Sequence, residues 1–398
     1  MPRDFSRFDA RLATFDRKAA PYPEAFKDVL SLKAADAAFK TVSTWPGYAI
    51  TPLVSLDVLA EATGVKAIHY KQEAARFGLN SFKALGGAYA VFRLMAQIIA
   101  DKTGKDACPQ AVAAGEFADL AATITVACAT DGNHGRSVAW GARLFGCKAV
   151  IFLHETVSTA REEAIAAFGA RIIRTPGNYD DSVREAARMA AVEGWNVVSD
   201  TSYPGYTDIP RNVMQGYSVM AEEALGQLGD KRPTHVFLQG GVGGLAAAVV
   251  AHLRERLGED APSFIVVEPE AAACLLASAE AGVPKAVTGD LDTIMAGLAC
   301  GEPSLIAWPI LADSVCGFMA IEDAAAAETM RLLASGEAGA KLVGGESGVA
   351  GLAGFLTAAS RADWRKRLSL DDDSVILVFG SEGDTDPDLY QKIIASDA

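Results

Sequence analysis

The chain has 398 residues, half of them hydrophobic and 22% charged. This composition is typical of folded globular proteins, and the length favours two domains. The net charge of −14 argues against nucleic acid or an anionic membrane surface as a partner. Residues 1–7 carry three charges and no apolar stretch, and no apolar run of the sequence is long enough to span a bilayer, so we expect a cytoplasmic protein.

The six cysteines are scattered and form no Cys-x-x-Cys pair. This spacing indicates neither a disulfide framework nor a zinc site, so we expect buried free thiols and no bound metal. Cys274 and Cys300 flank a Gly/Pro-containing connection across which they could meet. Pairing of these two residues therefore stays open.

Residues 1–45 are expected to form an N-terminal arm that packs on the body of the protein or on a partner subunit. From about Lys66 onward, short β-rich runs alternate with amphipathic helical patterns. Such alternation predicts an α/β fold with parallel strands covered on both faces. The predicted strands are Ala67–Gln72, Thr123–Ala127, Ala149–His154, Arg171–Arg174, Asn196–Ser199, Thr234–Gln239, Phe264–Glu268 and Val375–Phe379. Predicted helices include Asn133–Phe145, Thr159–Phe168, Tyr179–Glu193 and Met214–Leu228. Ligands of such sheets lie beyond the carboxyl ends of the strands, so the loops there are the candidate sites.

Lys83 lies in an unusual place for a lysine. We expect a helix from Ser81, its N-cap, to about Ala100, which puts Lys83 in the first turn. A cation there faces the positive end of the helix dipole, and this cost disappears if the amine is neutral or bonded as an imine. Lys83 is therefore a candidate for imine formation. The alternative is an ordinary surface lysine.

A glycine-rich turn, Gly240–Gly244 with Val242 at its centre, follows the strand Thr234–Gln239 and enters a helix. Backbone N–H groups at such a turn bind anions. No Lys follows as in a P-loop, and the pattern is not that of a dinucleotide fold, so a single phosphate fits best. The alternative is a turn needed only for tight packing.

A second strand-to-helix turn is Thr130-Asp131-Gly132-Asn133-His134-Gly135-Arg136. Asn133 can pair with a phenolic oxygen, and Asp131 can transfer a proton. Helix capping explains any one of these residues, and His134 is more typical of a structural histidine than of a catalyst.

Two further loops complete the candidate site. Ser381, after the strand Val375–Phe379, can offer a hydroxyl to a ring nitrogen; the alternative is a solvated acidic turn. Asp200 opens a long polar loop that reaches Pro210, for which a solvated surface connection is the alternative. A candidate imine lysine, a cradle for one phosphate, an amide and a hydroxyl together form a recognition set for pyridoxal 5′-phosphate (PLP).

Four motifs in this order resemble the fold-type II PLP-dependent enzymes, which include the threonine and serine dehydratases and the tryptophan synthase β subunit. The motifs are Ser-Phe-Lys at 81–83, Gly-Asn-His-Gly at 132–135, Gly-Gly-Val-Gly-Gly at 240–244 and Gly-Ser-Glu-Gly at 380–383. The resemblance spans roughly residues 45–390. It implies two interleaved α/β domains, each with a twisted, mainly parallel sheet covered by helices: a large PLP-binding domain, 1–88 with 206–398, and an inserted small domain, 89–205. It also implies a homodimer.

The same resemblance implies a role for each candidate residue. Lys83 forms the imine, Asn133 lies beside the 3′-hydroxyl, and Ser381 lies at the ring nitrogen. The phosphate is held by the glycine turn. The implied cofactor-binding residues are Lys83, Phe82, Asn133, Gly240, Gly241, Val242, Gly243, Gly244 and Ser381.

Within this group, the strings 76–83, 130–136 and 205–210 resemble the diaminopropionate ammonia-lyases, although Ser81 and Ser137 depart from the residues expected there. The resemblance implies α,β-elimination of D- and L-2,3-diaminopropionate to pyruvate and two ammonia. Lys83 and Asp131 would take the proton on opposite faces of the substrate. Asp131 and Asp200 would pair with its second ammonium.

Three alternatives remain. A serine or threonine dehydratase shares the cofactor, but the carboxylate of Asp131 counts against a hydroxyl leaving group. A β-replacement synthase shares the same early chemistry. A catalytically silent binding or regulatory protein has no need of Lys83.

Overall fold

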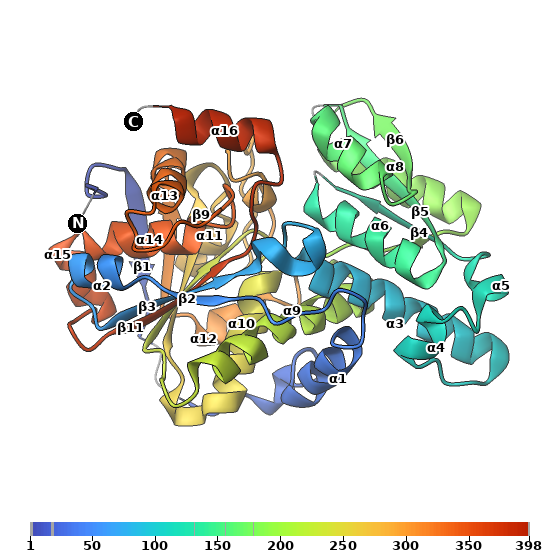
Figure 1. The fold of residues 1–398 in the computed structure, drawn as a ribbon, viewed down its shortest axis with the longest axis horizontal. Helices are drawn as coiled ribbons and strands as arrows, with labels where there is room; N and C mark the ends of the chain where they lie inside the picture. Colours follow the sequence, from blue (N-terminus) through green and yellow to red (C-terminus); the bar gives the residue numbers. More distant parts are fainter. Residues whose placement is uncertain (1–2, 17–19, 131, 156, 178, 397–398) are drawn as a thin grey trace. The chain divides into compact units, whose positions relative to one another are not determined.

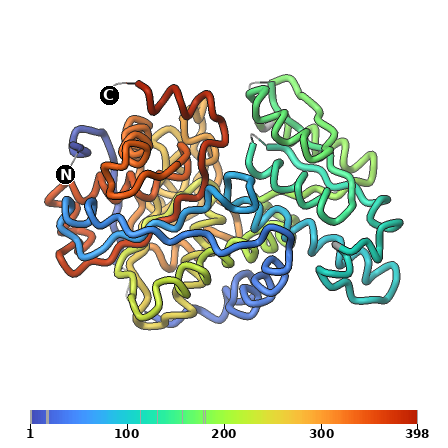
Figure 2. The backbone as a smooth tube through the Cα atoms, in the orientation of Figure 1, coloured from blue at the N-terminus to red at the C-terminus, as the bar shows by residue number. Residues whose placement is uncertain are grey.

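The computed structural model describes residues 3–16, 20–130, 132–155, 157–177 and 179–396. The chain forms two compact units. The larger unit comprises residues 1–32, 50–81 and 220–398, and the smaller one comprises 33–49 and 82–219. Figure 2 traces how the chain leaves the larger unit and returns to it twice.

The predicted domain bounds, with 89–205 inserted between 1–88 and 206–398, remain a prediction. The compact units place residues 33–49, 82–88 and 206–219 with the smaller unit.

The larger unit contains a seven-stranded sheet in the order β1-β10-β9-β8-β11-β3-β2. The five inner strands run parallel, and the edge strands β1 and β2 run antiparallel to their neighbours. The bounds are β1 Ala10–Thr14, β2 Leu53–Ser55, β3 Ala67–Gln72, β8 His235–Gln239, β9 Ser263–Pro269, β10 Gly317–Ile321 and β11 Val375–Gly380. Figure 1 shows this sheet with helices around it.

The inner strands are mostly apolar on both faces because helices cover both, although β3 carries the buried Lys71. On one face, Phe237 of β8 and Ile265 of β9 belong to a core that includes Phe355 of α14. α14 packs across β8, β9, β10 and β11, whereas α10 packs on β8. The helices of this unit are α2 Asp57–Thr63, α10 Gly244–Leu257, α11 Cys274–Ala281, α12 Trp308–Ser314, α13 Asp323–Ser335, α14 Ala350–Ala359, α15 Ala362–Leu368 and α16 Pro387–Ala395.

The smaller unit contains a four-stranded, fully parallel sheet in the order β6-β5-β4-β7. Its strands are β4 Thr125–Ala129, β5 Lys148–His154, β6 Arg171–Thr175 and β7 Asn196–Val197. A small core joins Val150 and Phe152 of β5 to Ala186 of α8. The helices are α1 Leu32–Val42, α3 Lys83–Thr103, α4 Pro109–Ala113, α5 Ala118–Ala121, α6 Asn133–Phe145, α7 Thr159–Ala166 and α8 Tyr179–Glu193. α9, Asp208–Leu228, continues from this unit into the larger one.

The expected α/β architecture is confirmed: both sheets are mainly parallel and covered by helices. The predicted Ala67–Gln72, Asn133–Phe145 and Tyr179–Glu193 have the bounds expected. Three strands, β1, β2 and β10, were not predicted. α9 begins at Asp208 instead of Met214, because Pro210 is tolerated in the first turn of a helix.

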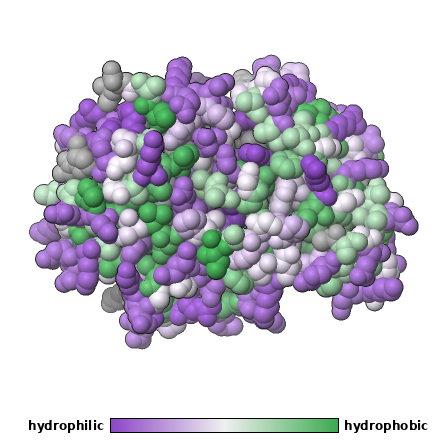
Figure 3. Space-filling model, in the orientation of Figure 1, coloured by the Kyte–Doolittle hydropathy of each residue, from purple (hydrophilic) through white to green (hydrophobic). Residues whose placement is uncertain are grey.

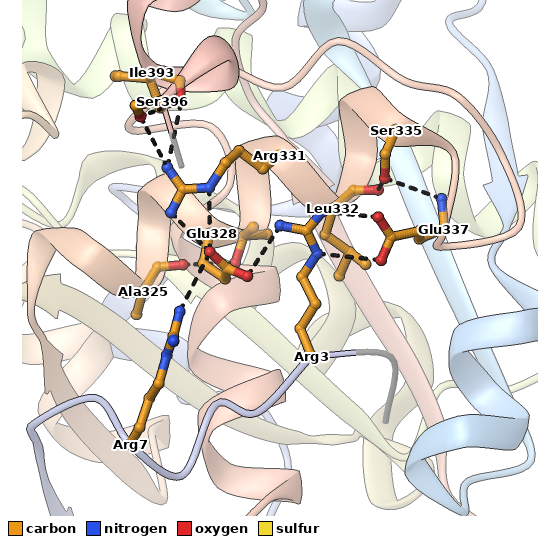
Figure 4. Close-up of polar contacts among 11 residues, drawn as sticks. Arg3, Arg7, Ala325, Glu328, Arg331, Leu332, Ser335, Glu337, Ile393 and Ser396 are labelled. Carbon is orange, nitrogen blue, oxygen red and sulfur yellow. Dashed lines mark hydrogen bonds and ion pairs between the residues drawn. The ribbon is translucent and has the colours of Figure 1, made fainter. Parts of the chain in front are cut away.

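The expected N-terminal arm, residues 1–45, divides between the units: residues up to 32 belong to the larger unit, and residues 33–45 belong to the smaller one. β1 adds an edge strand to β10. Before it, Arg3 binds Glu337 at 2.8 Å and Glu328 at 3.0 Å, while Arg331 donates to Glu328 at 2.7 Å. Arg7 lies 3.6 Å from the same Glu328 carboxylate (Figure 4). Glu328 is buried, and its carboxylate therefore holds the segment that carries Arg3 and Arg7 against the larger unit.

The surface mixes residue types. On the face shown in Figure 3, hydrophilic residues are interspersed with hydrophobic ones. No helix within the described ranges is long and apolar enough to cross a bilayer. All six cysteines fall within the described residues, and none of them forms a disulfide, Cys274 and Cys300 included. Cys128, Cys147 and Cys274 are buried as expected, but Cys108 is exposed and Cys300 and Cys316 are partly exposed, because the loops that carry them lie nearer the surface.

Candidate active site

Three positions of the turn at 240–244, Gly240, Gly241 and Gly243, have a geometry that requires glycine. Gly241 and Gly243 have φ angles of 61° and 96°, which L-residues rarely adopt. A Cβ at Gly240 would lie 2.4 Å from Cγ of Glu268, and one at Gly243 would lie 2.8 Å from Cδ1 of Leu311. The turn leads into α10, whose first N–H groups have no intrahelical acceptor. This is a cradle suited to one phosphate.

Ser381 follows β11, and its side chain is buried. The Gln239 side-chain nitrogen at the end of β8 lies 2.5 Å from the Phe379 carbonyl oxygen, 2.8 Å from the Gly348 carbonyl oxygen and 3.0 Å from the Ser381 hydroxyl oxygen. Its two hydrogens are shared among these three acceptors, and the Ser381 hydroxyl keeps a hydrogen that can be donated to a ring nitrogen. Sequence reasoning did not identify Gln239 as a site residue. A polar residue at the end of an otherwise apolar, buried strand could have indicated it.

The turn after Ser381 is not a solvated acidic turn. Glu382 is buried and accepts the N–H of Ser347 at 2.8 Å. Asp384 accepts from the Asn80 side chain at 3.1 Å, and the Gly383 N–H donates to the Asn80 carbonyl at 2.9 Å. Ser81 forms a bridge with Glu382. The turn therefore fixes residues 80 and 81, which lie two and three positions before Lys83.

A buried cluster of charges, Lys71, Glu73, Arg76 and Glu223, lies in the larger unit. Arg76 donates to Glu73 at 2.8 Å and to Glu223 at 2.7 Å, and Lys71 donates to Glu223 at 2.8 Å. None of the four side chains is more than 1% exposed. Two positive and two negative charges balance each other, and they tie η2 (Glu73–Gly78) to α9. Sequence reasoning did not find this cluster.

Lys83 is the first residue of α3 in the smaller unit, so the expected first-turn position is confirmed. The N-cap is Phe82 and not the expected Ser81, because Ser81 pairs with Glu382 instead. The Lys83 ammonium lies 2.5 Å from a carboxylate oxygen of Asp200. It also lies 5.6 Å from the centre of the Phe82 ring and 6.0 Å from that of Tyr217.

The surroundings of Asp200 favour the charged form of its carboxylate. Burial by itself raises the pKa of Asp200, but the nearby Lys83 ammonium and the His134 ring outweigh it and hold this pKa well below its usual range. Burial also raises the pKa of the Tyr217 phenol, and Lys83 opposes that rise. The lysine and the carboxylate therefore form a part-buried ion pair beside two aromatic rings.

The loop that begins at Asp200 is tied down, although Tyr203 within it is exposed. The Tyr206 phenol accepts the N–H of Ser199 at 2.9 Å and donates to the Val197 carbonyl at 2.9 Å. The Tyr203 and Tyr206 rings stack with centres 4.9 Å apart. The chain just before Asp200 is thus fixed by hydrogen bonds, and the loop is more than a solvated connection.

The turn into α6 brings further groups to this unit. Asn133 begins the helix, and the Thr130 hydroxyl oxygen accepts from the N–H groups of Gly132 and Gly135 at 3.0 and 3.1 Å. Ser137 donates to the Lys83 carbonyl at 2.7 Å, so its departure from the expected residue supports the start of α3. Asp131, a predicted catalytic residue, lies outside the described residues.

Taken separately, the groups of each unit suit a part of PLP. The smaller unit supplies a lysine beside a carboxylate, with Phe82 adjacent. The larger unit supplies a cradle that side chains would fill and a buried neutral hydroxyl on Ser381. A lysine can bond to the aldehyde of the cofactor, a glycine cradle can hold its phosphate, and a hydroxyl can donate to its ring nitrogen.

Comparison with known proteins also indicates a PLP-dependent enzyme. Residues 44–380 match the family described as "Pyridoxal-phosphate dependent enzyme". The chain is 43% identical over 362 residues to diaminopropionate ammonia-lyase of Salmonella typhimurium, covering 88% of this chain and 89% of the relative.

Solved structures of diaminopropionate ammonia-lyase from Escherichia coli are similar along their whole length. The complex with D-serine has a TM-score of 0.89 at 37% identity, covering 99% of this chain and 98% of that one. The complex with an aminoacrylate-PLP azomethine reaction intermediate has a TM-score of 0.86 at 37% identity, with coverages of 98% and 97%. The chain therefore belongs to the pyridoxal-phosphate dependent enzymes and, among them, to the family of the diaminopropionate ammonia-lyases.

Proposed function

We propose that the protein catalyses α,β-elimination of 2,3-diaminopropionate, in both configurations, to pyruvate and two ammonia. The observation that carries this proposal is the pair formed by Lys83 and Asp200, 2.5 Å apart at the start of α3. It combines an amine that can bond to an aldehyde with a carboxylate that can bind a substrate ammonium.

The cofactor-binding residues are assigned by the same proposal. Lys83 forms the covalent link to PLP, with Phe82 beside it, and Asn133 faces the 3′-oxygen. Ser381 donates to the ring nitrogen. The phosphate is held by Gly240, Gly241, Val242, Gly243 and Gly244. Bound PLP supplies the electron sink that acidifies the substrate Cα–H.

Two bases account for two substrate configurations. Lys83, once released from the cofactor, takes the Cα proton of the L-isomer, and Asp131 takes that of the D-isomer. The complex of the E. coli relative with D-serine supports a site that accepts a D-amino acid. Asp200 and Asp131 favour a substrate with a second ammonium over one with a hydroxyl, because a carboxylate pairs with the cation.

A serine or threonine dehydratase is the second candidate. It is favoured by the D-serine bound to the E. coli relative, since serine carries the hydroxyl that a dehydratase eliminates. The carboxylate of Asp200 beside Lys83 counts against this candidate.

A cytoplasmic location and a homodimer belong to the same proposal. The free thiols of all six cysteines fit a reducing compartment. The homodimer rests on the family resemblance, and the net charge of −14 fits a protein that binds a small amino acid and not nucleic acid.

The test is product formation by the cofactor-loaded protein, given D- and L-2,3-diaminopropionate, serine and threonine in turn. We expect two ammonia per pyruvate from both diaminopropionate isomers and little product from the hydroxy amino acids. Lys83→Ala should remove all activity, and Asp200→Asn should lower activity on diaminopropionate far more than the residual activity on serine. One ammonia per pyruvate from serine, with diaminopropionate inert, would establish the dehydratase instead.

A further inference from the structure

Gln239 ends β8 directly before the glycine turn, and its side chain reaches toward the end of β11. The residue is buried, with 2% of its surface exposed. Its amide nitrogen lies within hydrogen-bond distance of three oxygens, namely the carbonyl oxygens of Phe379 and Gly348 and the hydroxyl oxygen of Ser381. One side chain therefore connects the strand that leads into the phosphate cradle with Ser381.

Two backbone carbonyls fix the orientation of the Gln239 amide. A carbonyl oxygen only accepts, so the amide atom that lies 2.5 Å from the Phe379 oxygen and 2.8 Å from the Gly348 oxygen must be the nitrogen. The reversed amide would place an oxygen against these two oxygens. It would also move the NH₂ group to the place where the amide oxygen has no hydrogen-bond partner among the described residues. The amide therefore has one stable orientation.

This orientation limits where the hydrogen of the Ser381 hydroxyl can point. The amide nitrogen of Gln239 carries two hydrogens and has no lone pair to offer, so the hydroxyl cannot donate to it. The hydroxyl oxygen, 3.0 Å from that nitrogen, can only accept there. The two neighbouring carbonyls already accept from the same amide. The hydroxyl hydrogen of Ser381 is thus left for an acceptor outside this group.

We propose that Gln239 is a positioning residue that keeps the ring nitrogen of bound PLP unprotonated by directing the Ser381 hydroxyl toward it. The inference rests on the function proposed above, in which Ser381 donates to that nitrogen. A pyridine nitrogen has one lone pair, so a nitrogen that accepts from Ser381 carries no proton of its own. Gln239 acts through Ser381 and needs no contact with the cofactor.

The alternative role of Gln239 is purely structural, because two buried carbonyls need a donor. That role predicts a loss of stability on substitution and no effect on the ring nitrogen. The proposed role predicts such an effect. Without the amide, the Ser381 hydroxyl turns its hydrogen toward the carbonyls that have lost their donor. Its oxygen then faces the ring nitrogen, which gains a proton to donate to it.

The experiment is nitrogen NMR of the full chain loaded with PLP that carries ¹⁵N at the ring nitrogen, titrated with pH. Gln239→Glu keeps the shape of the side chain but offers Ser381 an acceptor, and Gln239→Met removes the polar group. We expect both variants to raise the pH midpoint of ring-nitrogen protonation by about one unit, a tenfold change in proton affinity. Gln227→Met is the matched control and should keep the midpoint, since Gln227 donates to a different carbonyl of the larger unit, that of Thr51.

Ser381→Ala separates the proposed role from the structural one. If Gln239 acts through Ser381, adding Gln239→Met to Ser381→Ala should leave the midpoint of Ser381→Ala unchanged. A further rise in the double variant overturns the inference, because the effect then does not pass through the hydroxyl.

The remaining outcomes are also decisive. Borohydride reduction followed by peptide mass analysis shows whether PLP is bonded to Lys83, and a different attachment point refutes the proposed function and this inference together. With PLP on Lys83, unchanged midpoints in both Gln239 variants overturn the inference alone. Loss of PLP binding in both variants also overturns it, because directing one hydroxyl is not enough to explain that loss.

Discussion

At the scale of single residues, Asp131 should matter for one substrate configuration. We expect Asp131→Asn to lower the initial rate on D-2,3-diaminopropionate at least about a hundredfold, the usual contribution of a positioned base, with a much smaller loss on the L-isomer. Initial rates of pyruvate formation measure this. Asp200→Asn is the matched control, because a residue that binds the substrate ammonium should affect both isomers alike. Equal losses in Asp131→Asn would refute the assignment of two bases.

In the proposed function, Ser381 determines the charge on the ring nitrogen of the cofactor. A neutral hydroxyl leaves that nitrogen largely unprotonated, which favours elimination over transamination. We expect Ser381→Asp to raise the fraction of turnovers that convert the cofactor to its amine form, measured by chromatography of the released cofactor. Ser381→Ala is the control and should weaken cofactor binding without that increase. No increase in Ser381→Asp counts against this role.

At the scale of elements, α3 and α6 approach each other through small residues. A Cβ at Gly87 would lie 2.2 Å from the Ser137 hydroxyl oxygen and 2.9 Å from its Cβ. We therefore expect Gly87→Ala to lower the free energy of unfolding by about 1–3 kcal/mol, as overpacking does. Ser137→Gly removes both clashing atoms, so Gly87→Ala should cost much less when it is added to Ser137→Gly than when it is added to the unchanged protein, as measured by urea titration. An equal cost in both cases would mean that α3 and α6 do not pack as described.

The buried charge cluster of Lys71, Glu73, Arg76 and Glu223 should depend on its balance. Arg76→Met leaves two carboxylates against one ammonium, and such a loss costs about 3–5 kcal/mol of unfolding free energy. Arg76→Met with Glu223→Met restores neutrality and should be less destabilised than the single variant. Chemical denaturation of both variants measures the difference. A double variant weaker by the sum of the two single losses would show that the four charges act independently.

Sequence patterns predicted some features of this protein and could not predict others, for physical reasons. The positions of Lys83, the glycine turn and Ser381 in the fold could be predicted because each lies at the end of a predicted strand or the start of a predicted helix, where local sequence decides the structure. Gln239 and Arg76 were missed because their partners, Ser381 and Glu223, are more than a hundred residues away. Edge strands β1 and β2 were missed because their pattern is weak and pairing with β10 and β3 decides them.

At the scale of the whole molecule, Glu328 connects the N-terminal segment to the larger unit and makes this connection dependent on pH. Burial raises the pKa of Glu328, but hydrogen bonds from Arg331 and Arg3 outweigh it, so this pKa lies below its ordinary value of 4.5. A lowered pKa means that the stabilisation is present above pH 4.5 and is lost as the pH falls below it. Figure 4 shows the three arginines that converge on this side chain.

We expect Glu328→Gln to lower the unfolding free energy at pH 7 by about 1–3 kcal/mol, the range for hydrogen bonds to charged groups. The difference from the unchanged protein should shrink as the pH falls below about 4.5. Thermal unfolding at several pH values measures it, with Glu337→Gln, whose carboxylate is more exposed, as a control with a smaller effect. A difference that is constant with pH would mean that the Glu328 charge is not what binds the segment.

The order of strands in the larger sheet has a consequence for synthesis on the ribosome. β11, which leads to Ser381, is the last strand of this sheet in the sequence, yet it lies between β8 and β3 in the middle of the sheet. Until residues 375–380 have left the exit tunnel, β3 and β8 each present an unpaired edge, and unpaired edges associate with other chains. The nascent chain thus needs residues 375–380 to join β8 to β3. We therefore expect chaperones to bind chains whose synthesis stops before these residues are made.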